Sequence, residues 1–98
     1  MRKIKKLIDN INEEIEGAKN YAEIYLEMKA KGEQLASKFK SMADDEIRHA
    51  MIIHDYTLQE IDTLKRVYTP PSEMLEIWDK EHVKYVEKVA WIKKMLEM

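Results

Sequence analysis

The chain has 98 residues, 45% of them hydrophobic, which suits one compact domain and leaves no room for a catalytic domain plus an accessory one. Its 17 basic residues nearly balance 19 acidic ones, so the net charge of -2 offers no basic excess for binding a nucleic acid backbone. Cysteine is absent, which excludes disulfides, thiolate-bound iron-sulfur clusters, cysteine-ligated zinc and a thiol nucleophile.

Only two glycines and two prolines interrupt the sequence, so a sheet protein with many tight turns is disfavoured and an all-α domain is predicted. The basic N-terminal residues are not followed by an apolar run of signal-peptide length, and no stretch of about 18 apolar residues is present. We therefore expect residues 1–98 to form a single soluble, cytoplasmic helical domain that binds neither membranes nor nucleic acid.

The first helix is predicted to end at Gly32, because glycine readily adopts the left-handed conformation that closes a helix. Lys29 and Lys31 would complement the carbonyl end of its dipole. One stripe, in steps of three and four, consists of Ile4, Leu7, Ile11, Glu14, Ala18, Tyr21, Tyr25 and Met28. Such a stripe indicates packing against a partner helix, and Glu14 is the only charged residue on it.

The second helix is predicted to run from about Glu33 to Tyr68 and has two inward stripes. The first stripe consists of Leu35, Phe39, Met42, Glu46, His49, Ile53 and Tyr56. The second consists of Ala36, Ala43, Ile47, Ala50, His54, Ile61 and Leu64. A helix with two such faces is expected to lie between two neighbours.

The third helix follows the pair Pro70 and Pro71, and Ser72 is predicted to be its N-cap. Its stripe consists of Leu75, Trp78, His82, Tyr85, Val89, Ile92 and Leu96. The sequence thus predicts three long helices.

The residues that could carry chemistry are Glu14, Glu46 and His49, because an unpaired charge at an inward position costs several kcal/mol. Glu46 and His49 are three residues apart and share one helix face, as in helical metal sites. In a hairpin folded at Gly32, Glu14 lies 18 residues before the turn, and Glu46 and His49 lie 14 and 17 residues after it. Their heights therefore agree within about 6 Å, so the three side chains are expected to converge.

Two carboxylates and an imidazole suit iron, and also manganese or zinc. The alternative is a buried ion pair between Glu46 and His49, with the second glutamate reaching water. Glu13 and Glu16 lie off the stripe and are interpreted as surface residues.

Asp79 and His82 repeat the three-residue spacing on the third helix. Their predicted height is roughly 15 Å from His49, and Glu60 would lie near His82 as an ion-pair partner. We therefore interpret His82 as a paired core histidine and only a lower-ranked ligand. His54 is interpreted as a core histidine, or as one that supports a metal ligand, rather than as a ligand itself.

At these residues the sequence resembles the ferritin-like superfamily, which includes rubrerythrins, bacterioferritins and the short encapsulated ferritins. The matching pattern is Glu14, Gly17 and Tyr21, followed by Glu46, His49 and Ala50, and it covers about residues 3 to 56. The resemblance implies an antiparallel helical hairpin, a di-iron carboxylate site, and a role for Tyr21 as a donor to a carboxylate ligand. A tyrosine that simply fills the core remains the alternative for Tyr21.

The sequence also departs from that family. A full bundle has four helices and a second Glu-x-x-His motif, whereas three helices and one such motif are predicted here. Ile47 stands where bacterioferritins place a haem-ligating methionine, and the C-terminal residues differ from the tail that directs cargo into encapsulin shells. What the resemblance implies is half of a di-iron site, completed by a homodimer or higher homo-oligomer.

Two functions are therefore considered. The first is a ferritin-like iron-binding protein, a ferroxidase-type oxidoreductase that oxidises Fe(II) with O2 or peroxide at a site shared by two chains. The second is a non-enzymatic helical oligomerisation module in which buried Glu-His pairs fix the register.

Overall fold

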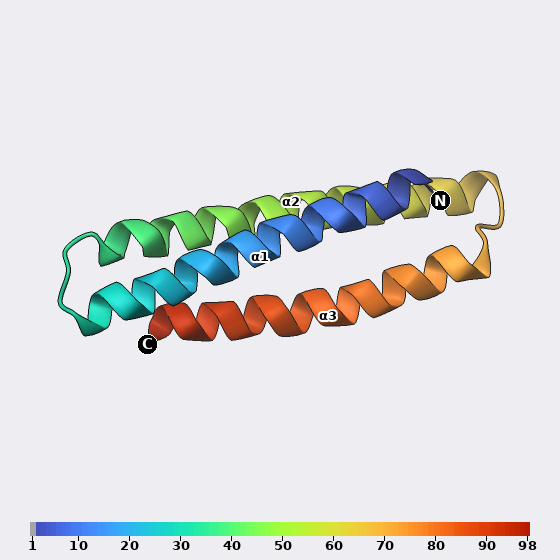
Figure 1. The fold of residues 1–98 in the computed structure, drawn as a ribbon. Helices are drawn as coiled ribbons and strands as arrows, with labels where there is room; N and C mark the ends of the chain where they lie inside the picture. Colours follow the sequence, from blue (N-terminus) through green and yellow to red (C-terminus); the bar gives the residue numbers. More distant parts are fainter. Residues whose placement is uncertain (1) are drawn as a thin grey trace.

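The computed structural model describes residues 2–98, which form three helices and no strand (Figure 1). The helices are α1 (Arg2–Ala30), α2 (Ala36–Val67) and α3 (Ser72–Glu97). α1 and α2 form an antiparallel hairpin, and α3 runs back alongside them, so that the C-terminus lies near the α1–α2 turn. The molecule is a rod of 55 × 17 × 17 Å. The predicted all-helical architecture is confirmed for these residues.

The α1–α2 turn forms at the predicted glycine. Gly32 has a φ of 70°, and its N–H donates to the Lys29 carbonyl at 3.0 Å. The N–H of Glu33 donates to the Met28 carbonyl at 2.9 Å, so the turn satisfies two carbonyls at the end of α1. Because residues 33–35 complete the turn, α2 begins at Ala36, later than predicted.

The connection between α2 and α3 corrects the prediction that Ser72 is an N-cap. Ser72 is the first residue of α3, and the cap position belongs to Pro71, which makes no side-chain cap bond. The ring of Pro71 fixes its φ, and its carbonyl accepts a hydrogen bond from the N–H of Met74 at 3.0 Å. The helix therefore starts one residue earlier than a serine cap would allow.

The core is arranged around α1, whereas the sequence predicted α2 as the middle helix. The α3 backbone approaches α1 more closely than it approaches α2. The reason is a second buried set on α1, Ile8, Ile15 and Ala22, beside the predicted stripe. Ile15 and the α3 residue Ile92 line the same groove between the two helices. Burial of each such isoleucine stabilises the fold by roughly 1.5–3 kcal/mol.

The two stripes of α2 differ in burial. The second stripe lies in the core, as predicted, except that Leu64 is only partly buried. The first stripe, which includes Leu35, Met42 and Tyr56, lies largely open to solvent, contrary to the prediction that it faces inward. Three helices cover only part of the circumference of α2. Within residues 2–98 this flank meets α1 along one edge, where Tyr21 lies near Phe39, and the rest of it is uncovered.

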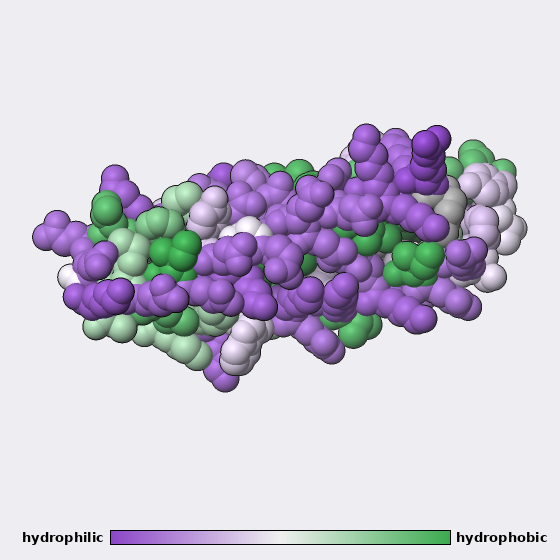
Figure 2. Space-filling model, in the orientation of Figure 1, coloured by the Kyte–Doolittle hydropathy of each residue, from purple (hydrophilic) through white to green (hydrophobic). Residues whose placement is uncertain are grey.

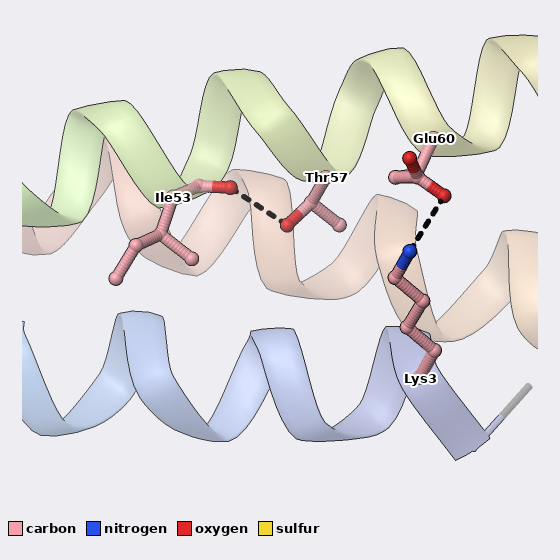
Figure 3. A network of polar contacts seen from close by, with 4 residues as sticks. All are labelled: Lys3, Ile53, Thr57 and Glu60. Carbon is pink, nitrogen blue, oxygen red and sulfur yellow. Dashed lines mark hydrogen bonds and ion pairs between the residues drawn. The ribbon is translucent and has the colours of Figure 1, made fainter.

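Polar contacts tie the ends of the helices together. Lys3 near the start of α1 donates to Glu60 near the end of α2 at 3.1 Å (Figure 3). A further bond lies within α2, where the hydroxyl of the buried Thr57 donates to the Ile53 carbonyl one turn earlier, at 2.7 Å. Lys29 donates to the Met98 carbonyl, which ties the end of α3 to the end of α1.

The surface is mixed in character. Figure 2 shows a mostly hydrophilic face on which hydrophobic patches gather toward both ends of the rod. Exposed apolar residues on α3 include Val83, Val86 and Trp91. None of the helices within residues 2–98 is both long and apolar enough to cross a membrane.

His54 is the core histidine that the sequence predicted, with 6% of its surface exposed. Its ring stacks on Tyr85 with a centroid distance of 4.1 Å and lies 4.9 Å from the ring of Trp78. Its Nε2 lies 2.9 Å from Nδ1 of His82, within hydrogen-bond distance. This aromatic cluster joins α2 to α3.

The partner of His82 corrects the sequence prediction. His82 is exposed and pairs with His54, whereas Glu60 pairs with Lys3. Tyr68 is extended, with φ -161° and ψ 171°, and Pro71 is close to extended, with φ -56° and ψ 138°. Because of this extended connection, α3 begins further back along α2 than it would after a tight turn. His82 therefore lies beside His54 and not near Glu60.

We expect acid to weaken the metal-free fold through His54. Burial, with a smaller contribution from His82, lowers the pKa of His54 below its ordinary value of 6.5, and nearby Asp55 only partly opposes this. The unfolded chain then binds a proton at His54 more readily than the folded chain. The stabilisation is complete above about pH 6.5 and is lost as the pH falls toward the folded-state pKa.

Urea unfolding at several pH values between about 7 and 5, with a chelator present, would measure this dependence. His54→Phe keeps an aromatic ring but removes the titrating group, so its free energy of unfolding should change less over the same range. Equal pH dependence in the two proteins would contradict the prediction.

Candidate metal centre

Three side chains from the two helices of the hairpin meet at mid-length. Glu14 comes from α1, and Glu46 and His49 come from successive turns of α2. One ligand atom of each lies within 4.8 Å of the others. Nδ1 of His49 is 3.5 Å from Oε2 of Glu14 and 3.8 Å from Oε1 of Glu46. Within residues 2–98 this is the one group of three or more such side chains that could hold a metal ion.

The convergence follows from the tight turn. Both helices are regular from the turn to the site, so each residue adds about 1.5 Å of height on its own side. The turn thereby brings Glu14 to the level of Glu46 and His49, as the residue counts predicted. The Glu-x-x-His spacing then presents both α2 side chains toward the same carboxylate.

The two carboxylates interact directly. A hydrogen bond with Glu14, together with partial burial, raises the pKa of Glu46 above its ordinary value. Like charges so close favour a state in which one carboxylate holds a proton. A cation placed between them would relieve the same repulsion, so this pair is suited to exchange a proton for a metal ion.

Gly17 makes room for one of these carboxylates. A Cβ atom at this position would lie 3.0 Å from Oε2 of Glu46. That is tighter than an ordinary van der Waals contact, so any larger residue would require the carboxylate to shift. The resemblance included a small residue at this position, and its role here is to cradle Glu46 against α1.

The site is half open to solvent. The side chains of Glu46, Glu14 and His49 are 25%, 29% and 46% exposed, respectively. Glu46 and His49 belong to the open flank of α2 described above, and Glu14 reaches it from α1. Two carboxylate groups and one imidazole within 4.8 Å fit a divalent first-row metal ion, and one chain leaves the rest of its coordination shell free.

The other residues that the sequence singled out do not belong to the three-residue cluster. Tyr21 is partly buried and its ring lies 6.2 Å from that of Phe39, while its role as a carboxylate donor stays a prediction. Asp79 is exposed, and neither it nor His82 belongs to the cluster. Glu13 and Glu16 lie on the surface, as predicted, and Glu16 is 3.7 Å from Lys88.

Sequence reasoning missed Glu81. This residue is only 7% exposed, and its Oε1 has no hydrogen-bond partner among residues 2–98. Within the same residues, Oδ1 of Asn12 on α1 is likewise buried without a partner. A periodic signal was present, because Met74, Trp78, Glu81 and Tyr85 also follow steps of four and three. The predicted stripe, which starts at Leu75, does not include Glu81.

The family comparison extends the resemblance beyond the hairpin. The family model described as Rubrerythrin matches residues 5–94, which adds most of α3 to the matched region. No match was found among curated proteins or among solved structures. Rubrerythrins are a ferritin-like di-iron carboxylate family whose members typically bind iron. Because the match covers nearly the whole sequence, the chain belongs to the rubrerythrin family.

Proposed function

We propose that this protein binds iron through Glu14, Glu46 and His49, and that two chains pair so that their clusters form one di-iron carboxylate centre. Fe(II) is the substrate of the centre, and O2 or peroxide is the oxidant, which makes the protein a ferroxidase-type oxidoreductase. The observation that carries the proposal is the three-donor cluster on a flank of α2 that is largely exposed to solvent. Membership of the rubrerythrin family supports iron as the metal.

The pairing follows from the incomplete ligand set. One chain supplies two glutamates and one histidine, and two copies supply the four glutamates and two histidines of a di-iron bundle site. Apolar residues flank the cluster along the open stripe, with Phe39 and Met42 before it and Ile53 and Tyr56 after it. A two-fold homodimer would bury these residues and bring the two clusters together. Higher homo-oligomers can build on the same dimer.

The three ligands have different roles in iron binding and oxidation. His49 offers a ring nitrogen, and the carboxylates of Glu14 and Glu46 supply negative charge that favours the higher charge of Fe(III) over Fe(II). The neighbouring Glu14 raises the pKa of Glu46, so a proton on Glu46 would compete with the metal ion for the same carboxylate. Two Fe(II) ions give up two electrons, which with two protons reduce O2 to hydrogen peroxide, or peroxide to two waters.

The open apolar stripe also suits a second candidate, a non-enzymatic oligomerisation module. In that case the stripe assembles the chains without metal, and the Glu-His pairs only fix the register. The two functions differ in metal binding and redox activity. Manganese or zinc in place of iron would preserve the site but alter or remove the oxidation chemistry.

Iron binding is tested by anaerobic Fe(II) titration followed by exposure to air. We expect the wild-type protein to bind about one Fe(II) per chain and to oxidise it, because each chain supplies half of the site. Glu46→Ala should lose most of this binding, whereas Glu13→Ala, an exposed carboxylate off the cluster, should retain it. Absence of binding by wild type would refute the proposal, and equal binding by Glu46→Ala would refute the ligand assignment.

Pairing is tested by size-exclusion chromatography with light scattering, with and without Fe(II). We expect a homodimer or a multiple of it, and we expect Met42→Glu to shift the protein toward monomer by placing a charge within the buried stripe. Val83→Glu, on the outer face of α3, is the matched control and should leave the mass unchanged. A strict monomer that binds two irons per chain would contradict the shared site.

Gly17→Ala should lower the affinity for Fe(II) without lowering the thermal stability of the protein. Alanine is favoured over glycine within a helix by roughly 0.5–1 kcal/mol, so thermal unfolding should not be weakened. Its Cβ should displace the Glu46 carboxylate and lower Fe(II) affinity. Asn20→Ala, at an exposed position of α1, is a control that leaves the site untouched. Unchanged Fe(II) affinity in Gly17→Ala would mean that the cradle has no role.

A further inference from the structure

The contact between His54 and His82 is a second meeting of metal-ligating side chains, apart from the carboxylate cluster. The chain has three histidines, and two of them meet here, with Nε2 of His54 2.9 Å from Nδ1 of His82. His54 comes from α2 and is buried, whereas His82 comes from α3 and is exposed. The pair therefore has one anchored ring and one ring that solvent can reach.

We propose that His54 and His82 form a second metal site, which takes a divalent ion that prefers imidazole ligands, with Zn²⁺ as the representative. Metal–nitrogen distances of about 2.0–2.1 Å place one ion in contact with both nitrogens at an angle of roughly 90°. A tetrahedral ion requires a separation near 3.4 Å, which a shift of about half an ångström by the exposed His82 provides. Water completes the shell on the open side.

The surroundings of His54 hold its ring in a ligating orientation. Its face stacks on Tyr85, and Trp78 packs nearby, so the ring has little freedom to turn. Its other nitrogen, Nδ1, lies 3.6 Å from Oδ1 of Asp55. A carboxylate beside the second ring nitrogen is the usual support of a histidine ligand, because it fixes which nitrogen faces the metal.

The histidine pair is distinct from the carboxylate centre. His54 follows His49 by five residues, which is about 140° around the helix and about 7.5 Å along it. His49 thus faces the open flank of α2, whereas His54 faces α3. The donors also differ, because two imidazoles favour zinc, cobalt, nickel or copper, while the carboxylates favour iron and manganese.

A metal ion at this position would join α2 to α3. These two helices have little direct backbone contact, and α3 rests mainly on α1. The ion would bind the docked arrangement and have no equivalent site once α3 leaves, so it would stabilise the docked state by mass action. This inference does not rest on the proposed iron function.

The test uses Zn²⁺ and a full-length variant, Glu46→Gln/His49→Gln, in which two of the three donors of the carboxylate cluster are replaced. Calorimetric titration should give about one Zn²⁺ per chain, and saturating Zn²⁺ should raise the melting temperature. Adding His82→Ala should weaken Zn²⁺ binding at least tenfold and abolish the rise, and Asp55→Asn should weaken it by about tenfold. Lys84→Ala, an exposed neighbour on α3, is the matched control and should bind as the parent does.

His82 is exposed, so its substitution should not impair folding, which circular dichroism checks directly. In the wild-type chain, Zn²⁺ should also shift the imidazole resonances of both His54 and His82. Equal Zn²⁺ affinity with and without His82, or no binding by the parent variant, would overturn the inference. Loss of iron binding at Glu46 would not, because the two sites share no ligand.

Discussion

The tight turn at Gly32 is the constraint on which the candidate site depends. Its left-handed glycine and two closing hydrogen bonds fix how far α2 starts from the end of α1. The helices are regular beyond it, so one inserted residue would shift α2 by about 1.5 Å and turn it by about 100°. Glu14, 18 residues away, would then face neither Glu46 nor His49. A short loop far from the chemistry thus determines whether the three donors meet.

The same arrangement places the candidate site on the surface proposed for pairing. The carboxylates of Glu14 and Glu46 lie close together with His49 beside both, and Gly17 leaves room for the Glu46 carboxylate against α1. They lie on the flank of α2 that α3 does not cover, because α3 packs mainly against α1. If α3 occupied that flank, the cluster would be closed within one chain. Its actual position leaves the three donors and the apolar stripe facing outward together, so the proposed metal binding and the proposed pairing would use the same surface.

α3 itself is held in a different way from the hairpin. The hairpin relies on a tight turn and continuous apolar packing, whereas α3 follows an extended connection and meets α2 through the rings of His54, Trp78, His82 and Tyr85. A histidine at the centre of that contact makes it sensitive to protons and gives it nitrogen donors. The cluster of Glu14, Glu46 and His49 and the pair of His54 and His82 therefore lie on different sides of α2, which contributes residues to both.

The sequence by itself determined the features that depend on one helix or one turn. Periodicity predicted the three helices, Gly32 predicted the hairpin, and counting residues from it predicted the meeting of Glu14 with Glu46 and His49. Only the tertiary structure decided how α3 packs: that α1 lies in the middle, that the first stripe of α2 stays open, that His82 meets His54, and that Glu81 is buried. The physical reason is that an extended connection, unlike a tight turn, does not determine the height or side on which the next helix packs. The height and the side of α3 depend on the packing of all three helices together, and a local sequence pattern does not report that packing.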